Sequence, residues 1–285
     1  MMKMILKIFT VLLFLVATCV KCIRQSAASV SSCFNWRLKL NLFKIGFSAY
    51  VLIFSVSVLE ATPLKIGEGD FILKPDTTTI YKTVDSPLGP VELKIHGFLP
   101  KGYKASDKRP AIVFFHGGGW YGGTPDHFYP QSRYFALRGM VCFSAQYRLI
   151  NANKTSPREC VVDGKSAIRW VRQHASELGV DPTRILAGGG SAGGHVAAAT
   201  ALCKGFNDVG GDLNISPRPE ALILFNPVFD NGPKGFAHSL VKDYWKEISP
   251  IDNIDGNAPP TIVILGTKDK FIPVATAERY KRIME

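Results

Sequence analysis

The sequence has 285 residues and is poor in the features that mark metal sites, disulfide scaffolds and nucleic-acid binders. After residue 61 only three cysteines remain, Cys142, Cys160 and Cys203, and their wide spacing is not that of a metal site or a disulfide framework. No basic stripe interleaved with aromatic residues occurs there either, which argues against nucleic-acid binding. We therefore expect a protein that needs neither a metal nor a cofactor.

Positive charge is concentrated at the start of the chain. Residues 1–60 carry seven lysines and arginines against Glu60 alone, which is +6 of the formal net charge of +11. The rest of the chain carries its charges scattered, as expected of a solvated surface.

The basic residues near the N-terminus precede two apolar runs, 8–20 and 45–59. Both runs are shorter than the roughly 20 residues that span a membrane. Basic residues before a short apolar run are typical of an export signal, and the small residue Ala61 predicts cleavage with a mature start near Thr62. A start codon downstream of Met1 and a two-span membrane anchor are the alternatives.

We therefore divide the chain into a leader, 1–61, and a catalytic domain, 62–285. Export predicts a periplasmic or secreted protein that touches a membrane only if the leader stays attached. A disulfide between Cys160 and Cys203 is compatible with export, whereas Cys142 lies in an apolar run and is expected to be buried.

Strand and helix signals alternate after Thr62. Two opening strands, 79–84 and 91–98, are expected to be antiparallel. Unbroken apolar runs predict strands at 111–115, 140–145, 184–187, 221–225 and 261–265, and helical spacing predicts helices at 157–178, 192–202 and from 273 onward. The segment 226–260 looks irregular. This alternation predicts an α/β fold with a mostly parallel sheet and helices on both faces.

The strongest functional motif is Gly189-Gly190-Ser191-Ala192-Gly193, which matches G-x-S-x-G. It lies between an expected strand and an expected helix, where this motif places a serine nucleophile on a tight turn. The helix N-terminus would direct backbone N–H groups at a developing oxyanion. A phosphate-binding loop is disfavoured because no Lys-Ser or Lys-Thr follows the glycines.

A second motif, His-Gly-Gly-Gly-Trp, begins at His116 directly after an expected buried strand. The backbone N–H groups of Gly117 and Gly118, together with that of Ala192, are the expected oxyanion-hole donors. We expect His116 to anchor this loop and not to act as a base.

Trp120 and Tyr121 follow these glycines. They are candidates for lining an acyl or alcohol pocket, and packing against the loop is an equally good interpretation.

On these two motifs the chain resembles the hormone-sensitive-lipase-like and feruloyl-esterase-like carboxylesterases of the α/β-hydrolase superfamily. The resemblance runs from Val91 to the C-terminus and includes Tyr-Arg-Leu at 147–149, the segment 163–172 and Gly-Thr-Lys-Asp at 266–269. It implies an α/β-hydrolase fold, a Ser–Asp–His triad and small or medium acyl esters. It also implies that Asp163 and Arg172 belong to the framework.

The same resemblance implies Asp269 as the triad acid, with Asp230 as the alternative. In this fold the catalytic histidine follows the acid in the chain. No histidine follows Asp269; the six in the sequence are His96, His116, His127, His174, His195 and His238. His195, four residues after Ser191, is expected to pack or hydrogen-bond locally.

The last strand and helix of the fold are missing as well. We therefore expect a C-terminally truncated chain whose histidine base lies beyond Glu285 and which is itself nearly inactive.

The sequence thus predicts an exported serine esterase that acts on small-molecule or polysaccharide esters, for example those with acetyl or feruloyl groups. Two alternatives come from other classes: a serine peptidase of the prolyl-oligopeptidase type, and a non-catalytic binding protein on a hydrolase fold.

Overall fold

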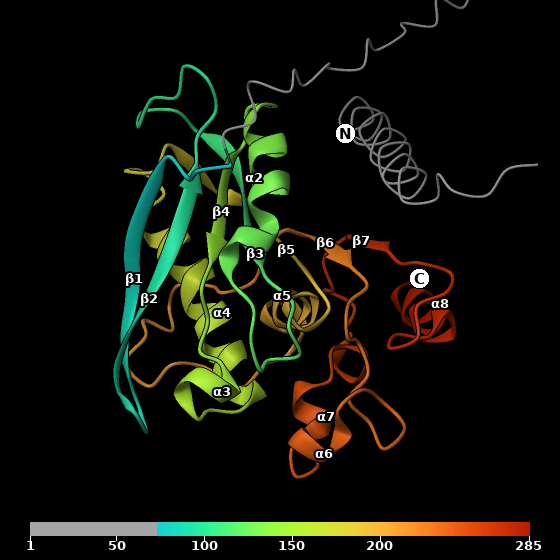
Figure 1. Cartoon of the computed structure of the whole chain (residues 1–285). Helices are drawn as coiled ribbons and strands as arrows, with labels where there is room; N and C mark the ends of the chain where they lie inside the picture. Colours follow the sequence, from blue (N-terminus) through green and yellow to red (C-terminus); the bar gives the residue numbers. More distant parts are fainter. Residues whose placement is uncertain (1–72) are drawn as a thin grey trace, which may run out of the picture. The chain divides into compact units, whose positions relative to one another are not determined.

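The computed structural model describes residues 73–285 (Figure 1). The leader predicted for 1–61, with its apolar runs and possible cleavage site, lies outside the described residues. Among the described residues, no helix is long and apolar enough to cross a membrane.

The described chain forms one seven-stranded sheet. Its strands are β1 (Thr77–Ser86), β2 (Gly89–Phe98), β3 (Arg109–Phe115), β4 (Val141–Ala145), β5 (Val180–Gly190), β6 (Ala221–Phe225) and β7 (Thr261–Ile264). The spatial order is β1-β2-β4-β3-β5-β6-β7. β1 pairs antiparallel with β2 and β2 with β4, whereas the remaining pairs are parallel. The expected antiparallel opening and mostly parallel sheet are confirmed.

Helices connect and cover the strands (Figure 1). They are α2 (Tyr129–Ala136), α3 (Ile150–Asn153), α4 (Pro157–Gln173), α5 (Ala192–Leu202), α6 (His238–Val241), α7 (Trp245–Ile248) and α8 (Val274–Met284), with 3-10 turns at Pro125–Phe128 and Pro250–Asn253. All five residues of β4 are buried, so both faces of the sheet are covered there.

The longest helix, α4, starts with a well-formed cap. Ser156 and Glu159 form a capping box, in which each side chain accepts from a backbone N–H at the helix start, and Pro157 occupies the first turn. The predicted start at residue 157 is therefore confirmed, although the helix ends at Gln173 and not at residue 178.

Some elements differ from the prediction. β5 is longer than the expected 184–187 because it pairs with β3 on one side and β6 on the other, and these ladders extend it into the glycines 188–190. The sequence patterns do not predict α2. The segment 226–260, expected to be irregular, contains the four-residue helices α6 and α7.

A buried ion-pair network ties α4 to the strands. Asp163 is fully buried and accepts from the guanidinium of Arg148 at 2.8 and 2.9 Å and from Lys82 Nζ at 2.8 Å. Arg172, at the end of α4, binds the Pro182 carbonyl at 3.0 Å and Glu220 at 2.7 Å. The geometry is that of framework residues.

The disulfide considered between Cys160 and Cys203 is not formed, because both thiols are free and buried. Cys160 Sγ donates to the Arg148 carbonyl at 3.1 Å, and Cys203 Sγ donates to the Ile248 carbonyl at 3.5 Å. Burial raises the pKa of Cys203 to about 12, which keeps this thiol protonated and unreactive.

Candidate active site

Four loops meet at the carboxyl ends of the parallel strands, where ligands bind in open α/β sheets. They follow β3, β5, β6 and β7 and contain, in that order, the His-Gly-Gly-Gly-Trp run, Ser191, the stretch from Asn226, and Asp269. The parallel pairing of these strands therefore brings both sequence motifs and the candidate acid to one edge of the sheet.

Ser191 lies on the turn between β5 and α5 with φ 54° and ψ −121°. A non-glycine residue in this region is strained, and such strain is typical of functional turns. The turn is held by three backbone bonds: Ser191 N donates to the Phe225 carbonyl at 3.0 Å, and the Ser191 carbonyl accepts from His195 N at 3.0 Å and from Val228 N at 3.3 Å. The side chain is half-buried and forms no hydrogen bond with another described residue.

Gly193 shows why this turn is rich in glycine. A Cβ at this position would lie against the carbonyl oxygens of Phe115 and His116, the last residue of β3 and the first of the following loop. Without a side chain, α5 can start directly against the end of β3. Ser191 and the glycine loop are therefore brought close together.

The loop after β3 runs beside the serine. A Cβ on Gly117 would be 3.4 Å from Ser191 Cβ and 3.2 Å from the Gly190 carbonyl oxygen. Gly118 has φ 122°, a conformation that a side chain would not tolerate there. The backbone of this loop therefore lies directly beside Ser191, at the start of α5.

His116 anchors the loop at its first residue. Its Nδ1–H donates to the Gly117 carbonyl at 2.8 Å, and its ring stacks on Tyr147 with 4.4 Å between centroids. The Tyr147 hydroxyl in turn donates to the His116 carbonyl at 2.7 Å. Burial lowers the pKa of His116 to about 4, so the ring is neutral near pH 7.

Trp120 and Tyr121 have different environments. Trp120 is fully buried in the main hydrophobic core, whereas Tyr121 is 43% exposed. Of the two interpretations of Trp120, packing against the loop therefore fits its environment. Tyr121 remains a candidate contact for a substrate.

Asp269 lies in the loop after β7. Its Oδ1 accepts from the backbone N–H groups of Phe271 and Ile272 at 2.8 and 2.9 Å, which fixes the carboxylate. The alternative acid, Asp230, is paired with Arg279 at 3.2 Å and accepts from Gly232 N. Asp230 is thus engaged in holding its own loop and α8.

The six histidines all lie in the described chain, and none has an imidazole nitrogen hydrogen-bonded to Ser191 or Asp269. Four of them bind through Nδ1: His96 to Thr78, His116 to Gly117, His174 to Trp170 and His238 to Asn231. His195 binds the Ile248 carbonyl through Nε2 at 3.0 Å, and His127 is exposed. The side chain of His195 therefore packs and hydrogen-bonds as predicted, but its hydrogen-bond partner, Ile248, is far away in the sequence.

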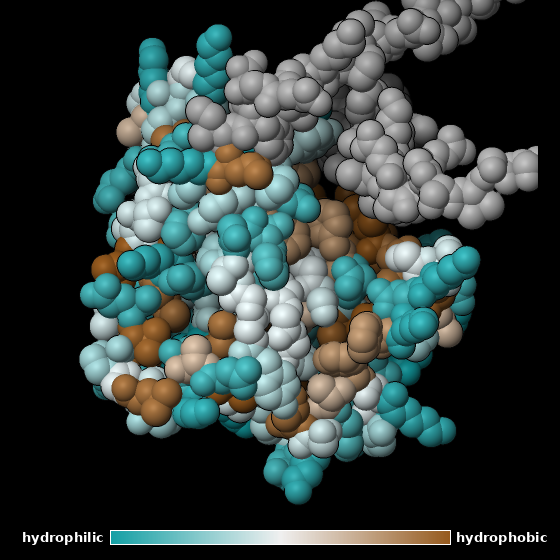
Figure 2. All heavy atoms as spheres, viewed as in Figure 1, coloured by the Kyte–Doolittle hydropathy of each residue, from teal (hydrophilic) through white to brown (hydrophobic). Residues whose placement is uncertain are grey.

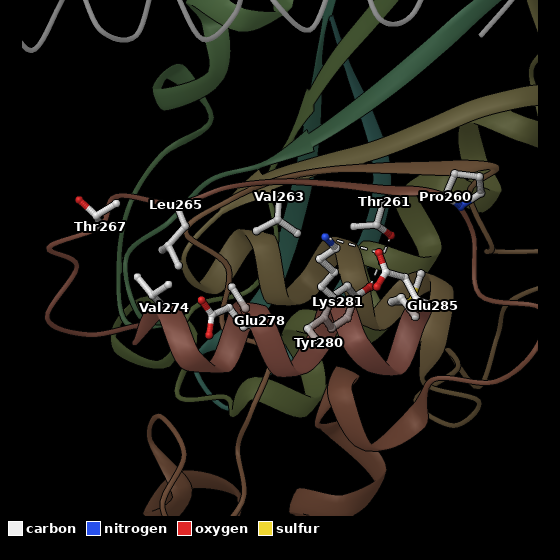
Figure 3. Close-up of a pocket in the computed structure, with 12 residues that line it drawn as sticks. Pro260, Thr261, Val263, Leu265, Thr267, Val274, Glu278, Tyr280, Lys281 and Glu285 are labelled. Atoms are coloured by element: carbon white, nitrogen blue, oxygen red, sulfur yellow. Dashed lines mark hydrogen bonds and ion pairs between the residues drawn. The ribbon is translucent and has the colours of Figure 1, made fainter.

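Two hollows lie near the last strand. One, of about 360 Å³, lies between the loop after β6 and the start of α8 and is lined by Phe236 and Phe271 among others. The other, of about 590 Å³, runs along β7, where Thr261 and Val263 of the strand and Leu265 just after it project toward α8 (Figure 3). This second hollow follows the flank of the edge strand and reaches Thr267 in the loop after β7. The space-filling view shows apolar surface at β7 beside the hydrophilic surface of α8 (Figure 2).

No group of three or more histidine, cysteine, aspartate or glutamate side chains in residues 73–285 is arranged to hold a metal ion.

The chain is similar to known esterases in sequence and in structure. The family described as BD-FAE matches residues 98–231. Structures of esterase 2 from Thermogutta terrifontis match at 43% identity and a TM-score of 0.69, over 73% of this chain and 77% of that one.

Curated relatives from Mycobacterium tuberculosis include the probable carboxylic ester hydrolase LipM, 28% identical over 60% of this chain and 44% of LipM. The carboxylesterase NlhH is 40% identical over 37% of this chain and 32% of its own length. The chain thus matches less than half the length of these two curated relatives. The esterase 2 similarity, which covers more than two thirds of that protein, shows that the chain belongs to the hormone-sensitive-lipase-like carboxylesterases of the α/β-hydrolase superfamily.

Proposed function

We propose that the chain carries the site of a serine carboxylesterase in which Ser191 is the nucleophile. The observation that carries this proposal is the strained turn at Ser191, between a buried strand and a helix N-terminus, with the backbone of the Gly117 loop beside it. This combination supplies a nucleophile and oxyanion donors in one place.

In the proposed reaction, Ser191 Oγ attacks the ester carbonyl and its proton passes to a histidine base. The backbone N–H groups of Gly117, Gly118 and Ala192 stabilise the oxyanion, and Asp269 orients the histidine. Collapse of the intermediate releases the alcohol, which takes the proton from the histidine. Water, activated by the same base, then hydrolyses the acyl-enzyme and frees the acid.

We propose that the base is a histidine other than the six in residues 73–285. The ring nitrogens of His116 and His195 are held by backbone carbonyls in buried positions, and His127 and His238 form no bond to Ser191. In the full-length protein, His127→Gln and His238→Gln should therefore leave turnover unchanged. Loss of turnover in either variant would contradict this assignment.

Small and medium acyl esters are the proposed substrates. Solved structures of the related esterase 2 hold propionate and butyrate, which are short carboxylic acids. The match to BD-FAE and the predicted export make acetyl or feruloyl groups on polysaccharides the proposed natural targets. Release of acetate or ferulate from xylan by the full-length protein would support this; activity on soluble esters alone would oppose it.

The predicted export belongs to the same proposal. We propose a leader that is removed near Ala61, so that N-terminal sequencing of exported protein should give a start near Thr62. A mature start upstream of residue 45 would favour a membrane anchor instead.

Labelling tests the nucleophile directly. A fluorophosphonate probe or paraoxon, which phosphorylates esterase 2, should modify Ser191 in the full-length protein. Ser191→Ala should abolish labelling and lower kcat on the order of 10⁶-fold. The matched control is Ser239→Ala at an exposed serine. Labelling at another residue would reject Ser191, and specific binding without labelling or turnover would favour a binding protein.

A further inference from the structure

On the proposed function, the loop at residues 117–120 supplies the oxyanion donors, so the contacts that hold this loop determine where the donors lie. Gly118, Gly119 and Trp120 follow one another in the left-handed region, with φ 122°, 62° and 65°. Glycine adopts this conformation freely, but a residue with a side chain does so at a cost of about 1–2 kcal/mol. The conformation of Trp120 must therefore be maintained by what its side chain contacts.

The indole of Trp120 is fully buried and meets the imidazole of His195 edge to face, with 5.0 Å between ring centroids and 87° between planes. Phe236 lies on another side at 5.9 Å. The Trp120 carbonyl accepts from Ile150 N at 2.9 Å. Burial of such a large ring outweighs the backbone strain, so the partners of the ring fix the end of the loop.

His195 is itself fixed. Its Nε2 is 3.0 Å from the Ile248 carbonyl, which can only accept, so the proton of the neutral ring is on Nε2. Its backbone N–H binds the Ser191 carbonyl at 3.0 Å. One residue therefore links the nucleophile turn, through the first turn of α5, to the ring of Trp120.

The two rings carry complementary polar atoms. Trp120 Nε1–H, a donor, and His195 Nδ1, an acceptor in this tautomer, are both buried and have no hydrogen-bond partner among the described residues. The Asn231 side chain, from the loop after β6, works against the lowering of the His195 pKa by burial, although its Oδ1 is also without a hydrogen bond. A buried histidine used only for packing would be replaceable by a hydrocarbon at lower cost.

We propose that His195 is a positioning residue that holds Trp120, and through it the Gly117–Gly118 backbone, in register with Ser191. Its effect should appear in the transition state, where the oxyanion forms, and not in ground-state binding. Misplacing such donors by about 1 Å costs on the order of 10²-fold in rate.

The test compares two variants of the full-length protein with p-nitrophenyl butyrate as the substrate. His195→Phe keeps a ring but removes both nitrogens, and Trp120→Phe removes the indole donor. Each variant should lower kcat by about 10–100-fold with KM nearly unchanged. Affinity for a trifluoromethyl ketone, which mimics the oxyanion, should fall by a similar factor. The double variant should be hardly worse than either single one, because both break the same link.

Thr200→Val is the matched control. Thr200 is also a buried polar residue of α5, and its hydroxyl binds the Ala197 carbonyl at 2.7 Å, within the helix and away from the loop. It should lower Tm and leave kcat unchanged. His195→Gln, which keeps an N–H for the Ile248 carbonyl, should recover part of the kcat and provides a second variant if His195→Phe does not fold.

Wild-type kcat in a folded His195→Phe or His195→Gln variant would overturn the proposal, as would independent, multiplying effects of the His195 and Trp120 changes. Such a result is distinct from failure of the proposed function, which would show as full activity in Ser191→Ala.

Discussion

Arg148 and Asp163 form a two-pronged ion pair beneath the end of β4. Arg148 Nε and Nη2 bind the two carboxylate oxygens at 2.8 and 2.9 Å, and the Arg148 backbone N–H adds a third bond at 3.0 Å. Two residues of β1 also bind Asp163. The Tyr81 hydroxyl donates to its backbone carbonyl, and Lys82 Nζ donates to its carboxylate. This single carboxylate therefore joins α4, β1 and the segment after β4.

Removal of the Asp163 charge should be strongly destabilising. Asp163→Asn leaves the buried Arg148 without a counter-charge, and breaking a buried pair from one side costs about 3–5 kcal/mol of unfolding free energy. Urea unfolding at pH 7 measures this. Asp181→Asn, at a partly exposed pair with Arg184, is the control and should have little effect. Equal effects of the two changes would contradict the framework role of Asp163.

Gly193 should not tolerate a side chain. In Gly193→Ala the new Cβ would press on the carbonyl oxygens of Phe115 and His116, so that the start of α5 must move away from β3. We expect a loss of about 10²-fold or more in kcat, because Ser191 and the oxyanion donors separate. Gly256→Ala is the control, since nothing lies within 4 Å of its Cβ position. Full activity in Gly193→Ala would show that this close approach is unimportant.

Acid should weaken folding through two buried histidines. Burial lowers the pKa of both His116 and His195 from 6.5 to about 4. Between these values the unfolded chain binds protons that the folded chain does not, so stability is complete above pH 6.5 and falls as pH decreases. Each histidine should contribute a loss of about 2–3 kcal/mol by pH 4.5.

Unfolding free energies measured in urea at several pH values between 7 and 4.5 provide the check. The slope should be smaller for His195→Gln than for the wild type. A His195→Gln variant with the wild-type slope would mean that this imidazole takes up its proton equally in the folded and unfolded states.

Short acyl chains should be preferred. The segment between β6 and β7 forms only the four-residue helices α6 and α7 and one 3-10 turn, which is little material for a long-chain lipid channel. The full-length protein should therefore cleave p-nitrophenyl acetate or butyrate with higher kcat/KM than the palmitate ester. Preference for palmitate would require a channel built by other parts of the protein.

Much of the fold and of the candidate site follows from local sequence patterns. Unbroken apolar runs identify β3, β4, β6 and β7 because strands buried on both faces need no polar alternation. The glycines around Ser191 and after His116 specify sharp backbone turns that only a few residue types permit. Since parallel strands place their carboxyl ends at one edge, these patterns alone bring the two motifs and Asp269 together.

The tertiary structure decided what depends on partners distant in sequence. The burial of Trp120 follows from the position of His195, and the free thiols of Cys160 and Cys203 follow from the separate carbonyls that they meet. The full length of β5 required pairing on both sides. Local patterns determine which backbone conformations are possible. Packing and hydrogen bonding between distant segments select the partner of each buried side chain. No short stretch of sequence specifies these partners, because they lie far away in the chain.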